Sequence, residues 1–181
     1  ILGSGAPCSS AGGYQPKFLA LRAPETAVLV KFSPRGGDGR SRRQADLLIA
    51  EHLAHRVLAE HGEEAARSQL VLTPDQAFLE VERFDRLPRG GRRGVVSLLA
   101  LDAEYLGRMR SWTDSVKHLA DAGHVAQSVV SSTRLRELFG RLIGNTDMHP
   151  GNLSFMAQGA TPLALAPVYD MLPAYYAAVV A

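Results

Sequence analysis

Cysteine is nearly absent from this sequence, in which Cys8 is the single one among 181 residues. An internal disulfide framework is therefore excluded, and the chain fits a reducing compartment. No apolar run reaches the ~18 residues that a membrane-spanning helix needs. No basic segment followed by an apolar stretch, the pattern of a signal peptide, opens the chain. We therefore expect a cytoplasmic protein that has no membrane partner.

Neither sign of charge is in excess. Lysine and arginine number 20 and aspartate and glutamate 18, which gives a net charge of +2, so the composition gives no reason to expect direct nucleic-acid binding. Two basic stretches, residues 35–43 and 86–93, contain no interleaved aromatic residues. Solvated loops are the better interpretation of both stretches.

The order of the expected elements indicates two parts. Strands are expected in the first half of the chain, where β-branched and apolar stretches are bounded by turn-forming residues; they are residues 18–21, 27–32, 69–73 and 77–84. One helix is expected there, over residues 45–60, because its apolar side chains recur at helical spacing; these are Leu47, Leu48, Leu53, Val57 and Leu58. Residues 33–43 and 86–94 are expected to be loops.

The second half is expected to be mainly helical up to residue 143. Its clearest helix covers residues 134–143, with one apolar face made by Leu135, Leu138, Phe139 and Leu142. Short strands follow at 153–155 and 163–168. This order predicts an α+β, bilobal fold, with an N-lobe-like part over residues 1–84 and a mostly helical C-lobe-like part over 85–181. The chain lacks an initial methionine and a helix stop signal at its end, so we expect a piece of a longer protein, truncated at both ends.

The strongest chemical signal lies in residues 144–152, a polar loop between an amphipathic helix and a short strand. Asp147 and Asn152 are five residues apart, which is the spacing of the catalytic Asp and the metal-binding Asn in the kinase catalytic loop. A carboxylate is needed to accept the proton of the attacking hydroxyl. An amide oxygen can hold Mg²⁺ without adding negative charge beside the phosphates. The alternative is a plain turn, since Asn, Asp, Pro and Gly form turns for reasons unrelated to catalysis.

Two further signals match the same template. Asp170 follows an apolar segment, at the place of the second metal-binding Asp of kinases. Lys31 closes the strand 27–32, as the lysine of the kinase Val-Ala-Ile-Lys strand does, and Glu51 on the 45–60 helix is available as its partner. Taken alone, Asp170 could be a surface turn residue and Lys31 a solvated lysine.

The segment around Gly12 and Gly13 precedes the lysine strand, and its backbone amides could cover phosphates. It matches neither of the common phosphate-loop patterns. His52 and His55 share a helix with Glu51, but His-Glu-x-x-His is absent, which argues against zinc. The Gly-x-Ser-x-Gly elbow of hydrolases is also absent.

Taken together, these segments resemble the HipA-like serine/threonine kinases of bacterial toxin–antitoxin systems. The resemblance is carried, in order along nearly the whole chain, by residues 13–17, 29–32, 50–54, 81–86, 145–152 and 169–172. Its most specific part is the Asn-x-Asp-x-His-x-x-Asn block over residues 145–152 with the later Tyr169-Asp170. The Gly-rich segment is longer and richer in serine than the family pattern.

The resemblance implies a kinase-like fold that uses ATP and Mg²⁺ to phosphorylate a protein serine or threonine. The expected catalytic residues are Asp147, His149, Lys31 and Glu51, with Asp147 as the base. The expected metal ligands are Asn152 and Asp170. The expected nucleotide-binding residues are Gly12, Gly13, Gln15, Lys17, Lys31, Glu82 and Phe84, with the adenine against the backbone of the 82–84 connector. A small DNA-binding antitoxin is the expected partner.

Two alternatives stay open. The same fold could phosphorylate a small molecule or a lipid, because a fold does not fix the acceptor. The chain could instead be a catalytically silent module that binds an antitoxin or DNA, although the presence of all five of Lys31, Glu51, Asp147, Asn152 and Asp170 argues against it.

Overall fold

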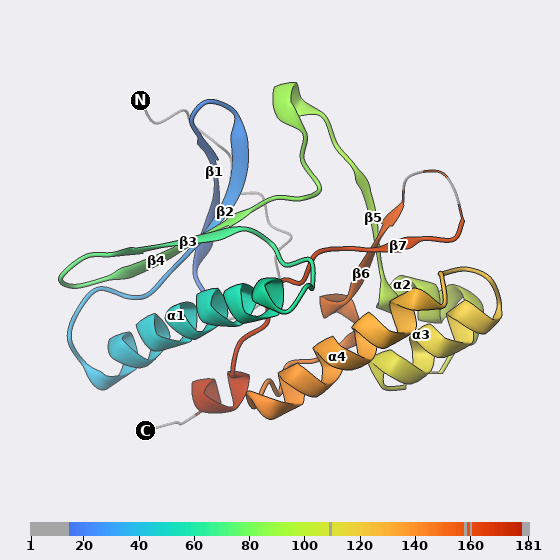
Figure 1. Ribbon diagram of the computed structural model, residues 1–181. Helices are drawn as coiled ribbons and strands as arrows, with labels where there is room; N and C mark the ends of the chain where they lie inside the picture. Colours follow the sequence, from blue (N-terminus) through green and yellow to red (C-terminus); the bar gives the residue numbers. More distant parts are fainter. Residues whose placement is uncertain (1–14, 109, 158, 160, 179–181) are drawn as a thin grey trace.

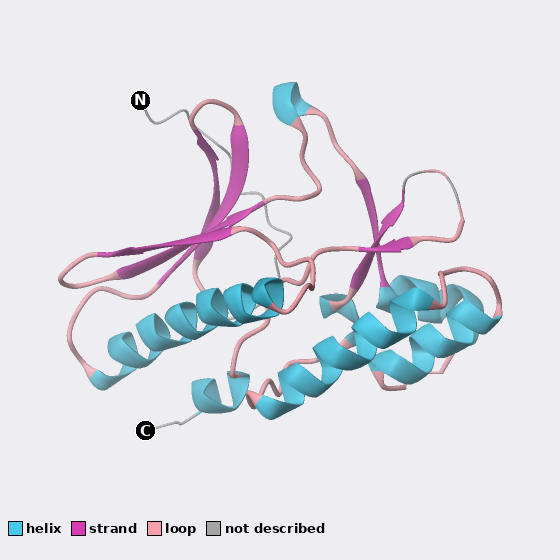
Figure 2. Ribbon diagram, viewed as in Figure 1, coloured by secondary structure: helices cyan, strands magenta, loops and turns pink. Residues whose placement is uncertain are grey.

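The computed structural model describes residues 15–108, 110–157, 159 and 161–178. Two sheets form separate ends of the molecule (Figures 1 and 2). One is four-stranded with the order β1-β2-β4-β3 and the other three-stranded with the order β5-β6-β7. The strands are β1 Lys17–Arg22, β2 Thr26–Phe32, β3 Ser68–Leu72, β4 Ala77–Glu82, β5 Gly94–Ser97, β6 Ser154–Ala157 and β7 Ala164–Leu165.

Four α-helices accompany the sheets in the described part of the chain. They are α1 Gly39–Glu60, α2 Leu98–Leu101, α3 Trp112–Asp121 and α4 Ser128–Leu142. Four short turns of other helical types complete the list, namely η1 Pro88–Gly90, η2 Asp102–Leu106, η3 Pro150–Asn152 and η4 Ala174–Ala178. Helix α1 lies beside the four-stranded sheet, and the remaining α-helices gather around the second sheet (Figure 1).

The four strands expected in the first half are present, and all the neighbours in their sheet are antiparallel. The loop expected over residues 33–43 is partly wrong, because α1 begins at Gly39 rather than near residue 45. Asp38 caps the helix by accepting a 2.7 Å hydrogen bond from the Ser41 amide, which satisfies one of the free amides of the first turn. The sequence pattern does not predict strand β5, which pairs with β6.

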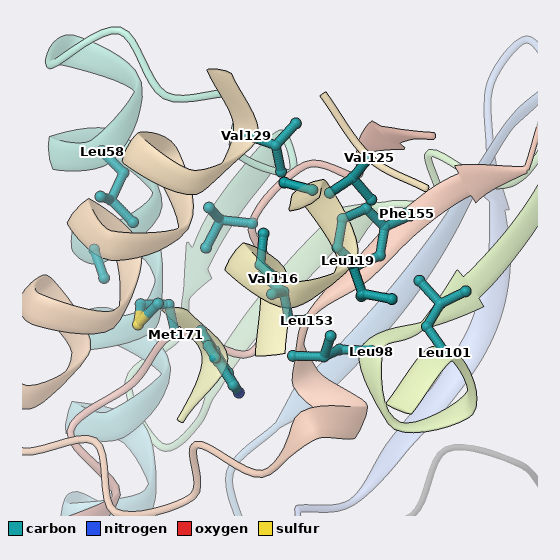
Figure 3. Close-up of a cluster of buried hydrophobic side chains, with 14 residues drawn as sticks. Leu58, Leu98, Leu101, Val116, Leu119, Val125, Val129, Leu153, Phe155 and Met171 are labelled. Atoms are coloured by element: carbon teal, nitrogen blue, oxygen red, sulfur yellow. The ribbon is translucent and has the colours of Figure 1, made fainter. Parts of the chain in front are cut away.

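Each sheet has its own buried core. One cluster joins α1 to the four-stranded sheet and contains Leu48, Ala66, Ala77, Leu79 and Val81. The larger cluster fills the helical part and reaches the end of α1 (Figure 3). Leu119 and Phe155 at its centre are fully buried. Both clusters pack against the segment after β7, the first through Tyr169 and the second through Met171.

Of the apolar face expected on the helix over 134–143, only Phe139 packs against the core. Leu135, Leu138 and Leu142 are 43%, 53% and 84% exposed. Helix α4 instead buries Val129, Thr133, Arg136, Glu137 and Gly140. The charged members are paired: Arg136 binds Glu63, and Glu137 accepts hydrogen bonds from Thr113 at the start of α3. Leu53 and Val57 on α1 are likewise 49% and 39% exposed.

This packing predicts opposite outcomes for two leucine substitutions. Leu119→Ala should lower the free energy of unfolding by roughly 2–5 kcal/mol, because it leaves a cavity in a filled core. Leu138→Ala should lower it by less than about 1 kcal/mol, because half of that side chain is already in solvent. Urea unfolding of the two variants tests this, and equal losses would contradict the assignment of the two helix faces.

Candidate active site

Lys31 lies inside the molecule, although it closes a strand. Its side chain is 3% exposed, and its Nζ donates to both carboxylate oxygens of Glu51, at 2.7 and 2.8 Å. Glu51, in the middle of α1, is 0% exposed. A third group completes the cluster, because Lys31 also donates to the Asp170 carboxylate. Glu51 and Asp170, which lie 20 and 139 residues after Lys31 in the sequence, thus share its ammonium group.

The charges in this cluster depend on one another. Burial by itself lowers the pKa of Lys31, but Glu51 and Asp170 outweigh it, so the net pKa is raised and the group stays an ammonium. Burial raises the pKa of Asp170, yet the charge and hydrogen bond of Lys31 outweigh it, so this carboxyl stays ionised. Burial raises the pKa of Glu51, against the opposing charge and hydrogen bond of Lys31. One ammonium group therefore faces two carboxyl groups, and Asp170 is the one whose ionised form is favoured.

Asp170 also has an unusual backbone. Its φ is 51°, in the left-handed region that few residues other than glycine adopt. Such a conformation persists only where the surroundings impose it, and it is concentrated at functional sites. Here it turns the chain between Tyr169 and Met171, which pack into different core clusters.

The loop over residues 145–152 is shaped by its own side chains. The Asn145 Oδ1 accepts from the Asp147 amide at 3.0 Å, and the Asn152 Nδ2 donates to the Asp147 carbonyl at 2.8 Å. The His149 Nδ1 accepts from the Gly151 amide at 3.0 Å and caps η3. Asp147 is therefore fixed through its backbone, while 66% of its side chain is exposed. The Asn152 amide uses its donor on the protein and leaves its oxygen as the group that can bind a cation.

This loop and the Asp170 segment are in direct contact. The Tyr169 hydroxyl donates to the Gly151 carbonyl at 2.8 Å, one residue before Asn152. On the other side of Asp170, the Asn145 Nδ2 lies 3.6 Å from the Met171 sulfur. The residues on both sides of Asp170 thus hold the ends of the loop that carries Asp147 and Asn152.

A lysine–glutamate pair, a second aspartate and an Asp–Asn loop are the side chains that the sequence analysis expects of a kinase site. Comparison with known proteins shows the family and the fold that hold them. The family described as HipA-like C-terminal domain matches residues 9–180. The chain belongs to this family. The toxin YjjJ of Escherichia coli K12 is 43% identical over 173 residues, a match that covers 93% of this chain and 39% of YjjJ. The chain thus spans about two fifths of that relative's length.

Solved structures share the fold of this HipA-like domain. HipA of Shewanella oneidensis MR-1, solved with HipB and operator DNA, matches with a TM-score of 0.66 at 24% identity, over 95% of this chain and 45% of that one. The proinflammatory kinase CtkA of Helicobacter pylori matches with a TM-score of 0.63 at 17% identity, over 87% of this chain and 55% of CtkA. The prediction of an α+β, kinase-like fold is confirmed.

The structure describes only some of the expected nucleotide-binding residues of the HipA-like domain. Gly12 and Gly13 lie outside the described residues. Lys17 pairs with Lys31 across β1 and β2, so both lysines lie on the same face of the sheet. The Gln15 Nε2 is buried and has no hydrogen-bond partner in the described part of the chain.

Glu82 and Phe84, at the two ends of the connector after β4, both have partners within the protein. The side chain of Glu82 forms an ion pair with Arg22, and its amide donates to the Arg67 carbonyl at 2.8 Å. Phe84 packs against Tyr169, with ring centroids 5.8 Å apart. The roles of Glu82 and Phe84 in holding adenine remain predictions.

The residues at hand suit Mg²⁺ better than a transition metal. Among the described residues, no group of three or more His, Cys, Asp and Glu side chains could hold a metal by themselves. Asn152 and Asp170, the expected ligands, would offer two oxygen atoms from two segments. Mg²⁺ is commonly held by one or two protein carboxylates and completes its shell with water and phosphate oxygens. The donor set therefore fits Mg²⁺ carried by a nucleotide.

Residues that the sequence analysis did not assign also shape the site. Asn145 fixes the turn at Asp147, and Tyr169 joins the two segments. Arg136 is 3% exposed and donates to Glu63 and to the Ala166 carbonyl, both at 2.7 Å, which ties α4 to the chain leading to Asp170. Sequence signals existed for two of them. Asn145 is a turn former two residues before Asp147, and Tyr169 belongs to the Tyr169-Asp170 pair of the family pattern.

His55 predicts an acid-sensitive stability. It lies one turn after Glu51, is 2% exposed, and has neither ring nitrogen hydrogen-bonded within the described residues. Burial, with a smaller contribution from Lys31, lowers its pKa from 6.5 to about 4. Below pH 6.5 the unfolded chain therefore binds a proton at His55, whereas the native protein binds it only near pH 4. Stability should fall between pH 6.5 and about 4, by about 3 kcal/mol in total.

A His55→Leu variant isolates this effect, because the other groups titrate alike in both proteins. Urea unfolding from pH 8 to pH 4 should show a steeper loss for the parent protein than for the variant. At pH 8 the variant should be at least as stable as the parent, since no unsatisfied polar group remains buried there. Parallel curves would contradict the buried, neutral state of His55.

Proposed function

We propose that this HipA-like domain is the phosphoryl-transfer centre of a protein kinase, which uses ATP and Mg²⁺ to phosphorylate a serine or threonine hydroxyl. The observation that carries the proposal is the buried pair of Lys31 and Glu51, which the partly exposed Asp170 joins through Lys31. A buried lysine with two carboxyl groups costs free energy to maintain, and phosphate binding beside a metal site is a function that such a lysine serves. The exposed Asp147 carboxylate lies on the loop that contacts the residues on both sides of Asp170.

The roles follow from the surroundings of each group. Lys31, oriented by Glu51, binds phosphate oxygens, and Lys17 adds positive charge on the same face of the sheet. Asn152 and Asp170 hold the metal ion, whose charge would offset that of the phosphates. Asp147 accepts the proton of the acceptor hydroxyl and is accessible to it because the side chain is exposed. His149 shapes the loop through the Gly151 amide and lies 4.0 Å from the Asp147 carboxylate.

The family context supports a toxin kinase with an antitoxin partner. The relative from Escherichia coli is named a toxin, and the Shewanella HipA was solved with HipB and operator DNA. We infer that the longer protein to which this domain belongs pairs with a small DNA-binding antitoxin. No helix among the described residues has the length and hydropathy needed to cross a bilayer.

The acceptor is tested with the full-length protein, Mg²⁺ and ATP labelled on its γ-phosphate, incubated with a cell lysate. We expect label on serine or threonine of a protein, located by mass spectrometry. Label in a lipid or a small metabolite would move the assignment to another kinase of the same fold. ATP binding without transfer, or no binding, would favour a silent module.

A further inference from the structure

Tyr169 occupies the junction between the two segments that hold the proposed metal ligands. Its ring packs against Phe84 and the core cluster of the four-stranded sheet, while its hydroxyl reaches the loop at Gly151. The chain then turns sharply at Asp170, whose φ is positive. One side chain thus touches the connector, the first core and the catalytic loop.

The direction of its hydrogen bonds is fixed by chemistry. The Gly151 carbonyl can only accept, so the single hydroxyl proton of Tyr169 is donated to it, at 2.8 Å. The Ser154 Oγ lies 2.6 Å from the same hydroxyl oxygen and must therefore be the donor of that second bond.

We propose that Tyr169 is a positioning residue. Through its hydroxyl it sets the distance between the two proposed metal ligands, Asn152 and Asp170. Gly151, which it holds, directly precedes Asn152, and Tyr169 itself directly precedes Asp170. A rigid, partly buried ring that packs against Phe84 thus connects Gly151, the neighbour of one ligand, to Asp170, the other ligand. Loss of the hydroxyl removes the hydrogen bond that ties the Gly151 carbonyl to the Asp170 segment and leaves the ligands themselves unchanged.

This inference rests on the proposed Mg²⁺·ATP site and is tested on the full-length protein by calorimetric titration of ATP at several Mg²⁺ concentrations. For Tyr169→Phe, which removes one oxygen atom, we expect the midpoint of the Mg²⁺ dependence to rise on the order of 10-fold, as is typical when a residue that orients a metal ligand is lost. ATP affinity without Mg²⁺ should be unchanged. A merely structural role would lower both affinities together.

Ser154→Ala is the matched control, because it removes the other bond of the same hydroxyl and leaves the bond to Gly151. Its Mg²⁺ midpoint should equal that of the parent protein. Hydrogen exchange gives a readout without ligand: the Gly151 and Asn152 amides should exchange faster in Tyr169→Phe and not in Ser154→Ala.

The outcomes separate the two proposals. If the parent protein binds ATP without any Mg²⁺ dependence, the proposed function fails and this inference fails with it. If the parent is Mg²⁺-dependent and Tyr169→Phe has the same midpoint and the same amide exchange, only the positioning role is overturned.

Discussion

Lys31→Met should lower the free energy of unfolding by about 3–5 kcal/mol, the usual cost of leaving a buried charge without its partner. Glu51 is fully buried and Lys31 is its direct partner. Glu51→Leu should cost less, because Lys31 keeps Asp170 as a second partner. The double variant Lys31→Met/Glu51→Leu should recover much of the loss, since two apolar side chains then replace the pair and Asp170 can reach solvent.

Phosphoryl-transfer activity should not change in parallel with stability in this double-mutant cycle. The double variant has no cation for the phosphates, so its phosphoryl transfer should stay abolished although the fold is restored. Urea unfolding gives the coupling energy of the pair. Arg56→Met/Glu60→Leu on the same helix is the control, since that pair is more than 60% exposed on both sides and should couple by less than about 0.5 kcal/mol. Additive losses at Lys31 and Glu51, or activity in the double variant, would contradict the account.

Asp147→Asn should lower phosphoryl transfer by roughly 10²–10⁴-fold, the usual contribution of a general base. Its melting temperature should stay the same, because the loop is held by the Asp147 amide and carbonyl, which the substitution keeps. Single-turnover transfer and thermal melting of the full-length protein measure both.

The plain-turn alternative for residues 144–152 predicts the reverse result. If Asp147 only shaped the turn, the variant would melt earlier and keep its activity. Asp46→Asn is the matched control, because Asp46 is an exposed aspartate on α1 away from the loop, and it should change neither quantity. Asn152→Ala is less informative, since it also removes the hydrogen bond to the Asp147 carbonyl and should cost about 1 kcal/mol of stability.

The parts of the site that the sequence predicted are those with fixed spacing. Asp147 and Asn152 lie in one loop, and Lys31 and Glu51 sit on elements whose periodicity is clear, so the ion pair of Lys31 with Glu51 could be expected. The further bond from Lys31 to Asp170 joins positions 139 residues apart. No local pattern contains such a contact, and the same is true of the bond from Tyr169 to Gly151.

The helix face on α4 shows the opposite case, in which a clear local pattern misleads. Leu135, Leu138 and Leu142 recur at helical spacing but point away from the core, whereas Arg136 and Glu137 are buried. Their partners Glu63 and Thr113 lie on other elements, so a periodicity argument counts these charges as solvent-facing. The early start of α1 was predictable, because Asp38 before Gly39 is a regular cap residue.

The most direct test of the central claim is a crystal structure of the full-length protein with Mg²⁺ and a non-hydrolysable ATP analogue. We expect a metal ion bound by the Asn152 amide oxygen and the Asp170 carboxylate, Lys31 on the phosphates, and the Asp147 carboxylate facing the terminal phosphate. A nucleotide bound elsewhere, or a metal ion that touches neither Asn152 nor Asp170, would contradict it.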